Sequence, residues 1–246
     1  MRRVIYVLLT LVMATALLLS ACQQPGPAPT ATATPKPTTP AATPAASLAP
    51  TPTSPSTAET PRYGGMLRII HRLPPRGLYP ASPVGASGNE GAFETLLELD
   101  EKGNIVPFLA TGWTVSPDAK SLTIPLRKGV KFHDGTDFNA AAVKSNLEAR
   151  KAIKFGDLDN VATIDVVDDY TVRLNLSKFS NLLLGYLTQL GTGMSSPTAV
   201  DKLGKDAIIF NPVTTSPFRF VIYDKDVRLR YERFDGYWQK GRPYLD

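Results

Sequence analysis

Residues 113–146 constrain the fold of this chain more than any other stretch, because turns, strands and a helix follow one another there with clear boundaries. Leucine and isoleucine alternate with other residues over 122–126, which predicts a half-buried strand. A Lys-Gly pair interrupts the alternation, residues 130–132 resume it, and an Asp-Gly pair predicts the next turn. The amide oxygen of Asn139 can accept a hydrogen bond from the first turn of a helix that we expect over 140–150. The stretch therefore predicts two strands followed by a helix.

The remainder of the chain after residue 61 is long enough for one domain with its own core. The same pattern rules predict a strand over 64–70, a short helix over 90–99 with a core-facing apolar stripe, a hairpin over 161–176, a helix over 179–190, a helix capped by Ser196 that ends near Gly204, and a hairpin over 218–233. This mixture of strands and helices predicts an α/β domain of mixed α+β character.

The stretch 113–146 resembles the signature of the family 5 extracellular solute-binding proteins, the peptide-, dipeptide- and nickel-binding receptors of ABC importers. The family pattern runs approximately W-x-x-S-x-D, then F-x-L-R-x-G-V-K-F-H-D-G, then F-x-A-x-D-V. The residues in register are Trp113, Ser116, Asp118, Leu126, Arg127, Gly129, Val130, Lys131, Phe132, His133, Asp134, Gly135, Phe138, Ala140 and Val143. Two residues depart from the pattern. Pro125 suggests an edge position, since it cannot donate a ladder hydrogen bond, and Ala142 removes an acidic residue from the first helical turn.

The resemblance covers nearly all of residues 62–246, including a G-G-x-L start at 64–70 and a Y-W-x-G-x-P-Y-L-D segment at the end of the chain. It implies a periplasmic-binding-protein-like fold of type II, here the first lobe, with a mixed sheet and a small hairpin-rich subdomain. A complete family member is longer, so the resemblance implies that the second lobe, which closes over the ligand, is absent. A truncated product, a split gene and a fragment of a longer protein all remain open.

Two loops are the candidate ligand contacts. Residues 81–89 are rich in Gly, Ser and Pro, and in peptide-binding relatives this region approaches the ligand backbone, although a plain surface loop accounts for the composition equally well. Residues 211–218 resemble the family's N-P-V-G-T-G-P-Y/F loop, with other residues in place of its two glycines. If the loop needs positive φ there, each replacement costs on the order of 1 kcal/mol. The resemblance thus implies the ligand-binding residues Pro83, Val84, Gly85, Ala86, Thr214, Thr215 and Ser216.

Residues 1–21 predict a lipoprotein signal peptide. Arg2 and Arg3 form a positive start, an apolar run follows, and Leu-Ser-Ala before Cys22 resembles the lipobox of bacterial lipoproteins, in which the cysteine is acylated. An uncleaved membrane anchor with a chance cysteine is the alternative. Residues 22–61 are rich in Pro, Thr and Ala, which predicts a disordered tether. We therefore expect an extracytoplasmic protein that is lipid-anchored through Cys22 to a bacterial cell membrane, on its periplasmic or cell-surface side.

Composition argues against several classes of function. The 27 basic and 22 acidic residues give too mild a balance to indicate nucleic-acid binding, and one cysteine with two histidines argues against a disulfide or a zinc site. His133 and Asp134 could suggest a general base, but no nucleophile motif accompanies them. Trp113 and Trp238 could stack on a ligand, although tryptophans near strand ends more often belong to the core. We expect no enzymatic activity, no cofactor and no metal.

The favoured function is therefore the lipid-anchored substrate-binding component of an ABC importer, which captures short peptides or a similar small solute. The partners that the resemblance implies are an oligopeptide or other small solute, an ABC permease and its ATPase, and the membrane through the lipid anchor. The alternative is a surface interaction domain without a transport role, derived from a truncated receptor.

Overall fold

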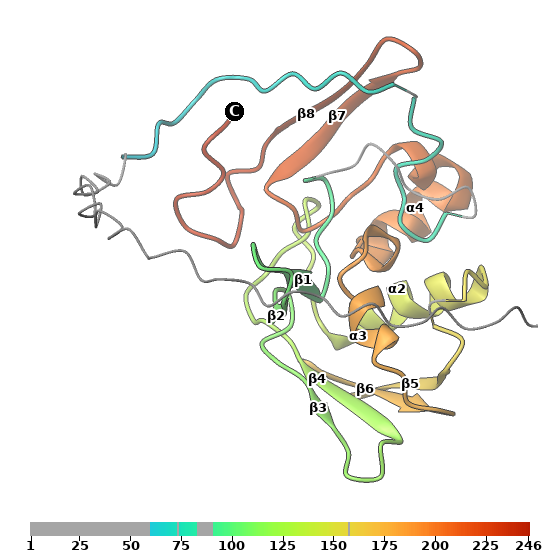
Figure 1. Ribbon diagram of the computed structural model, residues 1–246. Helices are drawn as coiled ribbons and strands as arrows, with labels where there is room; N and C mark the ends of the chain where they lie inside the picture. The colour runs from blue at the N-terminus through green and yellow to red at the C-terminus, as the bar shows by residue number, and fades with distance from the viewer. Residues whose placement is uncertain (1–59, 73, 83–90, 157) are drawn as a thin grey trace, which may run out of the picture. The chain divides into compact units, whose positions relative to one another are not determined.

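The computed structural model describes residues 60–246, apart from residues 73, 83–90 and 157 (Figure 1). The described residues belong to one unit that begins at Ala58. In chain order its elements are β1 (Leu97–Leu99), β2 (Ile105–Pro107), β3 (Thr114–Val115), β4 (Ser121–Pro125), α2 (Ala140–Ala152), β5 (Val161–Asp168), β6 (Thr171–Leu176), α3 (Leu182–Tyr186), η1 (Leu190–Thr192), α4 (Pro197–Ala207), η2 (Ile208–Phe210), β7 (Phe218–Asp224) and β8 (Arg228–Arg233). The predicted signal peptide, Cys22, the tether and residues Pro83, Val84, Gly85 and Ala86 lie outside the described residues.

A four-stranded antiparallel sheet in the order β3-β4-β6-β5 carries the main core. Leu122, Ile124 and Leu174 are fully buried and alternate with less buried residues, as expected of strands with one covered face. Helix α2 packs against β5 and β6, and Figure 1 shows α2 and α3 on the same side of the sheet. Phe132 and Phe138 are the largest fully buried side chains, and their rings meet edge to face. Burial of each ring contributes about 1.5–3 kcal/mol to stability.

The predictions of strand β4 and helix α2 are confirmed. The Asn139 side chain accepts a hydrogen bond from the Ala142 N–H at 2.9 Å, as predicted for the cap, and the first turn of α2 holds no acidic residue. The pairing of β3 stops at Thr123, so Pro125 lies beyond that strand. There the Thr111 N–H donates to the Pro125 carbonyl oxygen at 2.9 Å. The ladder therefore uses the carbonyl of this proline and needs no donor from it.

Three predicted elements are wrong in the described part of the chain. Residues 91–96 form no helix, and 97–99 form strand β1, because their backbone pairs with 105–107. Residues 130–132 form no strand and contribute only an isolated bridge between Lys131 and Asp137. Residues 64–70 form no strand, although their sequence is typical of one. In each case the local pattern is right for a strand or a helix, and the distant pairing partner decides the outcome.

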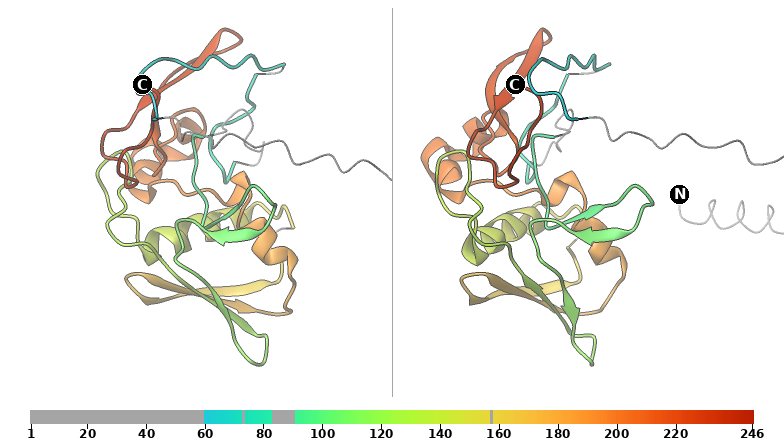
Figure 2. Two further views of the ribbon diagram at one scale, coloured as in Figure 1. Left: turned by 60° about the vertical axis from the view of Figure 1, so that its left-hand side comes forward. Right: turned by 90° about the vertical axis from the view of Figure 1, so that its left-hand side faces the viewer.

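Both predicted hairpins are confirmed as β5–β6 and β7–β8. The helix capped by Ser196 is confirmed as α4, with a kink at Gly204, whereas the predicted helix over 179–190 is shortened to α3. The strand pairs of the described chain are all antiparallel, where we expected a mixed sheet. Four of these pairs join consecutive strands through short connections, and such connections can only join antiparallel neighbours. Figure 2 shows the β7–β8 hairpin apart from the four-stranded sheet.

Membrane-spanning segments were sought among the described residues only. Within that part of the chain, no helix is both long enough and apolar enough to cross a membrane.

Candidate functional site

The loop 211–218, which contains three of the predicted ligand residues, is fixed on both sides by backbone contacts. The His133 N–H donates to the Thr214 carbonyl at 2.8 Å, and the Ser196 N–H donates to the Val213 carbonyl at 2.8 Å. Ser195 and Thr214 also form an isolated antiparallel bridge. The conserved-looking His-Asp turn of the sequence therefore serves to position this loop.

The ring of His133 holds the same loop from the other direction. Its Nε2 lies 2.8 Å from the Ser216 carbonyl oxygen, and its Nδ1 accepts a longer hydrogen bond, 3.4 Å, from the Thr214 N–H. These partners require a neutral ring with the proton on Nε2. Burial lowers the pKa of His133, with Arg219 adding to the effect, so the neutral form is favoured at pH 7. Both ring nitrogens are thus engaged by the backbone of the loop.

Asp134 and Ser196 connect this loop region to helix α4. The Ser196 hydroxyl donates to Asp134 Oδ2 at 2.5 Å and accepts from the Ala199 N–H at 3.1 Å, which caps the helix. Thr136 donates to Asp134 Oδ1 through its hydroxyl at 2.6 Å and through its backbone N–H. Burial alone would raise the pKa of Asp134, but the hydrogen bonds from Ser196 and Thr136 outweigh it and hold the pKa below its ordinary value. The carboxylate is a structural acceptor here.

Ser196→Ala should therefore lower the free energy of unfolding by about 1–2 kcal/mol, because it removes the cap of α4 and one donor to a charged carboxylate. Urea unfolding of the purified chain, followed by circular dichroism, measures this difference. Ser180→Ala is the matched control, since that hydroxyl accepts only a 3.3 Å hydrogen bond at the exposed start of α3. Equal losses in the two variants would contradict the bridging role of Ser196.

The structure places the predicted residues Thr214, Thr215 and Ser216 inside the lobe, where all three are buried. The Thr214 hydroxyl donates to the Ala92 carbonyl at 2.9 Å, and the Ser216 hydroxyl lies 2.9 Å from that of Thr214. Neither replaced glycine position has a positive φ, so the loop accepts ordinary residues there without backbone strain. The side chains support the loop from within, and a contact between this loop and a ligand stays a prediction.

Sequence reasoning missed a buried carboxyl group at Glu94, which joins the start of the lobe to the end of the chain. Its Oε1 accepts from the Tyr237 hydroxyl at 2.6 Å, and its Oε2 accepts from the Trp238 indole N–H at 3.0 Å. Burial raises the pKa of Glu94 to about 7, and hydrogen bonds from Tyr237, Trp238 and Thr215 limit the rise. Residue spacing could not reveal this cluster, because its members are separated by 143 and 144 positions.

Trp238 is held on its other face by Arg127 and Phe108. The guanidinium carbon of Arg127 lies 4.6 Å from the centroid of the indole, within cation–π range, and Arg127 Nε donates to the Phe108 carbonyl at 2.9 Å. The rings of Phe108 and Trp238 are 5.7 Å apart. Trp113 and Trp238 both pack against the main core while partly buried, so these contacts give Trp238 a structural role.

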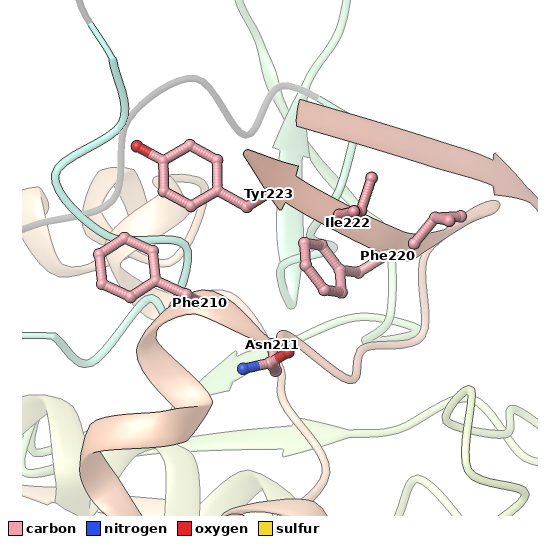
Figure 3. A pocket seen from close by; sticks show the side chains of 6 residues that line it. Phe210, Asn211, Phe220, Ile222 and Tyr223 are labelled. Carbon is pink, nitrogen blue, oxygen red and sulfur yellow. The ribbon is translucent and has the colours of Figure 1, made fainter. Parts of the chain in front are cut away.

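An open hollow of about 220 Å³ lies between the end of α4 and strand β7 (Figure 3). Phe210 and Tyr223 stack with nearly parallel rings, 5.3 Å between centroids, and Val221 is exposed at the same place. The Asn211 amide is turned back to the Ala207 carbonyl. The lining holds no charged side chain, so this hollow can pack against an apolar surface and offers no acid, base or nucleophile.

The same holds for metal chemistry in the part of the chain that the structure covers. Within residues 60–246 and outside the gaps, no three His, Cys, Asp or Glu side chains gather in a way that could hold a metal ion. The described residues therefore suggest binding by backbone and apolar contacts.

Comparison with protein families gives a match over residues 104–246 to the bacterial extracellular solute-binding proteins, family 5. Among curated proteins, the chain is similar to the glutathione-binding protein GsiB of Salmonella typhimurium, with 40% identity over 159 residues. That match covers 63% of this chain and 31% of the relative. The chain therefore spans about a third of the length of the curated relatives that it matches.

Solved structures show the same kind of likeness. The chain is similar to the periplasmic binding protein DppA of Helicobacter pylori in complex with the peptide STSA, with a TM-score of 0.66, 27% identity, and coverage of 75% of this chain and 42% of that one. It is also similar to the periplasmic binding protein AgaA of Agrobacterium tumefaciens R10 in complex with agropinic acid, with a TM-score of 0.63, 32% identity, and coverage of 70% and 36%. These likenesses confirm the type II periplasmic-binding-protein fold.

Proposed function

The chain belongs to the bacterial extracellular solute-binding proteins of family 5, and from this premise we propose that it is the substrate-binding component of an ABC importer. In this role it captures a small solute outside the cytoplasm and delivers it to a permease that is driven by a separate ATPase. The observation that carries the proposal is the family match over residues 104–246. Such receptors bind their ligand and release it unchanged, so we propose no catalytic step.

Short peptides are the proposed ligand class, with glutathione as the first candidate. The support is the 40% identity to a glutathione-binding protein and the likeness to a binding protein that holds the peptide STSA. The proposed contacts are the loop 83–86 and the backbone of 214–216. Backbone groups suit this task because a peptide ligand offers its own N–H and C=O groups for pairing. The likeness to a receptor for agropinic acid keeps other small solutes within the same proposal.

A lipid anchor at Cys22, followed by a tether over 23–61, would keep the receptor at the membrane. Each buried CH₂ of an attached acyl chain stabilises membrane attachment by about 0.8 kcal/mol, so several chains together hold firmly. Cys22→Ser should therefore move the protein from the membrane fraction to the soluble fraction after cell lysis. Immunoblots of the two fractions measure this, with Ser20→Ala as a nearby control that keeps the thiol. Unchanged membrane retention of Cys22→Ser would exclude the lipid anchor.

The ligand proposal is tested with an extended chain, in which the part of S. typhimurium GsiB that follows the matched region is joined after Asp246. Titration with glutathione and with a library of di- and tripeptides is followed by tryptophan fluorescence. The extended chain should give a saturable change, and the 246-residue chain alone should respond weakly, because one lobe cannot exclude water from the ligand. The GsiB part alone is the control and should not respond. A flat response of the extended chain would favour the surface interaction domain.

A further inference from the structure

The segment 64–70, Gly-Gly-Met-Leu-Arg-Ile-Ile, has the sequence of a strand but forms none. It is nevertheless held in place near both ends. The Gly64 N–H donates to the Tyr244 carbonyl at 2.7 Å, and the Tyr223 hydroxyl donates to the Pro75 carbonyl at 3.3 Å. In Figure 1 the segment runs as an extended trace past the β7–β8 hairpin. The chain is thus positioned and extended, as a strand would be.

Four of the five side chains from 66 to 70 are apolar, and all four are exposed. The exposed fraction is 68% for Met66, 66% for Leu67, 63% for Ile69 and 98% for Ile70. In an extended chain, successive side chains point to opposite faces, so both faces of this segment carry exposed apolar groups. Strands with apolar residues on both faces are typical of sheets that are covered on both sides. The segment therefore has the composition of an internal strand without its neighbours.

The β7–β8 hairpin beside it is incomplete in the same sense. It forms a sheet of only two strands, and an isolated two-stranded hairpin is marginally stable in water. The hollow beside β7 exposes the ring of Phe210 and the side chain of Val221. Tyr223, which lines this hollow, is also the residue that contacts the 63–75 segment. The same part of the lobe thus presents an unpaired strand-like segment and an uncovered apolar hollow.

We propose that the receptor polypeptide following Asp246 supplies a β-strand that pairs with residues 64–70, together with apolar side chains that fill the hollow beside β7. The proposal rests on the proposed function, since it assigns the rest of the receptor as the partner. The relatives provide the missing length, because this chain matches only 31% of GsiB. The position of Asp246 provides the geometry: its N–H donates to the Gly65 carbonyl at 3.1 Å, and its Oδ2 accepts from the Gly65 N–H at 3.0 Å. A chain that continues from Asp246 therefore leaves beside the segment that needs a partner.

Hydrogen–deuterium exchange of the 246-residue chain and of the extended chain tests this pairing. Amide protons of 64–72 should exchange at least about tenfold more slowly in the extended chain, because ladder hydrogen bonds protect them. Exchange that is equally fast in both proteins would overturn the proposal. Slow exchange in the 246-residue chain at high but not at low concentration would also overturn it, since the partner would then be a second copy.

Two variants separate backbone pairing from simple apolar contact. Ile69→Pro removes one backbone N–H, and Ile69→Ala removes only side-chain volume. In the extended chain, Ile69→Pro should abolish the exchange protection of 64–72, while Ile69→Ala should keep most of it. In the 246-residue chain, both should be silent, because residue 69 is exposed and unpaired to any strand there. Equal protection in the two extended variants would contradict a paired strand.

The readouts also distinguish this proposal from the function on which it rests. Exchange protection does not depend on any ligand, so protection without glutathione or peptide binding would keep the strand pairing and reject the ligand class. Ligand binding without protection of 64–72 would keep the receptor function and reject the pairing.

Discussion

Replacing Glu94 by glutamine should remove a loss of stability that the unsubstituted chain suffers between pH 4.5 and about pH 7. Burial raises the pKa of this carboxyl group to about 7, from an ordinary value of 4.5. The unfolded chain therefore releases the proton first as the pH rises, and the folded chain keeps it. The stabilisation is complete below pH 4.5 and disappears as the pH passes 7, which amounts to about 3 kcal/mol for a buried group. Glutamine stays neutral throughout and should show no such loss.

Urea unfolding at several pH values between 4.5 and 8 measures this difference. His133 titrates with the opposite sign, because burial lowers its pKa and its contribution to stability is lost as the pH falls below 6.5. Comparison of Glu94→Gln with the unsubstituted chain at each pH cancels that contribution. Glu98, whose pKa is also raised by burial, is the matched control: Glu98→Gln should change the pH profile much less, since its side chain is more exposed. Parallel profiles for Glu94→Gln and the unsubstituted chain would rule out the buried proton.

Asn146→Ala should lower the free energy of unfolding by about 2–4 kcal/mol. The Asn146 amide bonds the backbone of Ser195 twice: its Nδ2 donates to the Ser195 carbonyl at 2.8 Å, and its Oδ1 accepts from the Ser195 N–H at 3.0 Å. Both partners are buried, so alanine leaves a backbone donor and a backbone acceptor unpaired away from water. The change also releases α2 from the segment that precedes α4.

Asn175→Ala is the control for this prediction. Asn175 on β6 also makes two side-chain hydrogen bonds, to Thr163 and Asp165, but on an exposed face where water can replace them. Its loss should stay within about 0.5 kcal/mol. Urea unfolding at pH 7 compares the two variants, and a loss for Asn146→Ala as small as that of the control would show that water reaches the Ser195 backbone.

Local sequence patterns predicted those parts of the fold that local contacts hold together. Asn139 and Ser196 were recognised as helix caps, because the hydrogen bonds of a cap span only three residues. The β5–β6 and β7–β8 hairpins followed from alternation on both sides of a turn. Pro125 was placed correctly beyond a neighbouring strand for the same reason, since a missing N–H is visible in the sequence.

The errors arose where a distant partner decides the structure. Residues 91–99 have a helical stripe, yet strand β2 and the Tyr237–Trp238 pair determine their conformation. Glu94 looked like a surface position of that helix and is instead a buried acceptor. Residues 64–70 have the pattern of a strand, but a strand requires a neighbour, which no local pattern supplies. Thr214 and Ser216 show the reverse case: the glycine pattern suggested strain, and the backbone avoids it with ordinary φ.

Equilibrium dialysis of the extended chain against labelled glutathione tests the central claim most directly, with chromatography of the label that is recovered. The account predicts saturable retention by the extended chain, little retention by the 246-residue chain, and glutathione that returns chemically unchanged. Retention by the GsiB part alone, or recovery of a converted product, would contradict the claim that this lobe is half of a binding site without chemistry of its own.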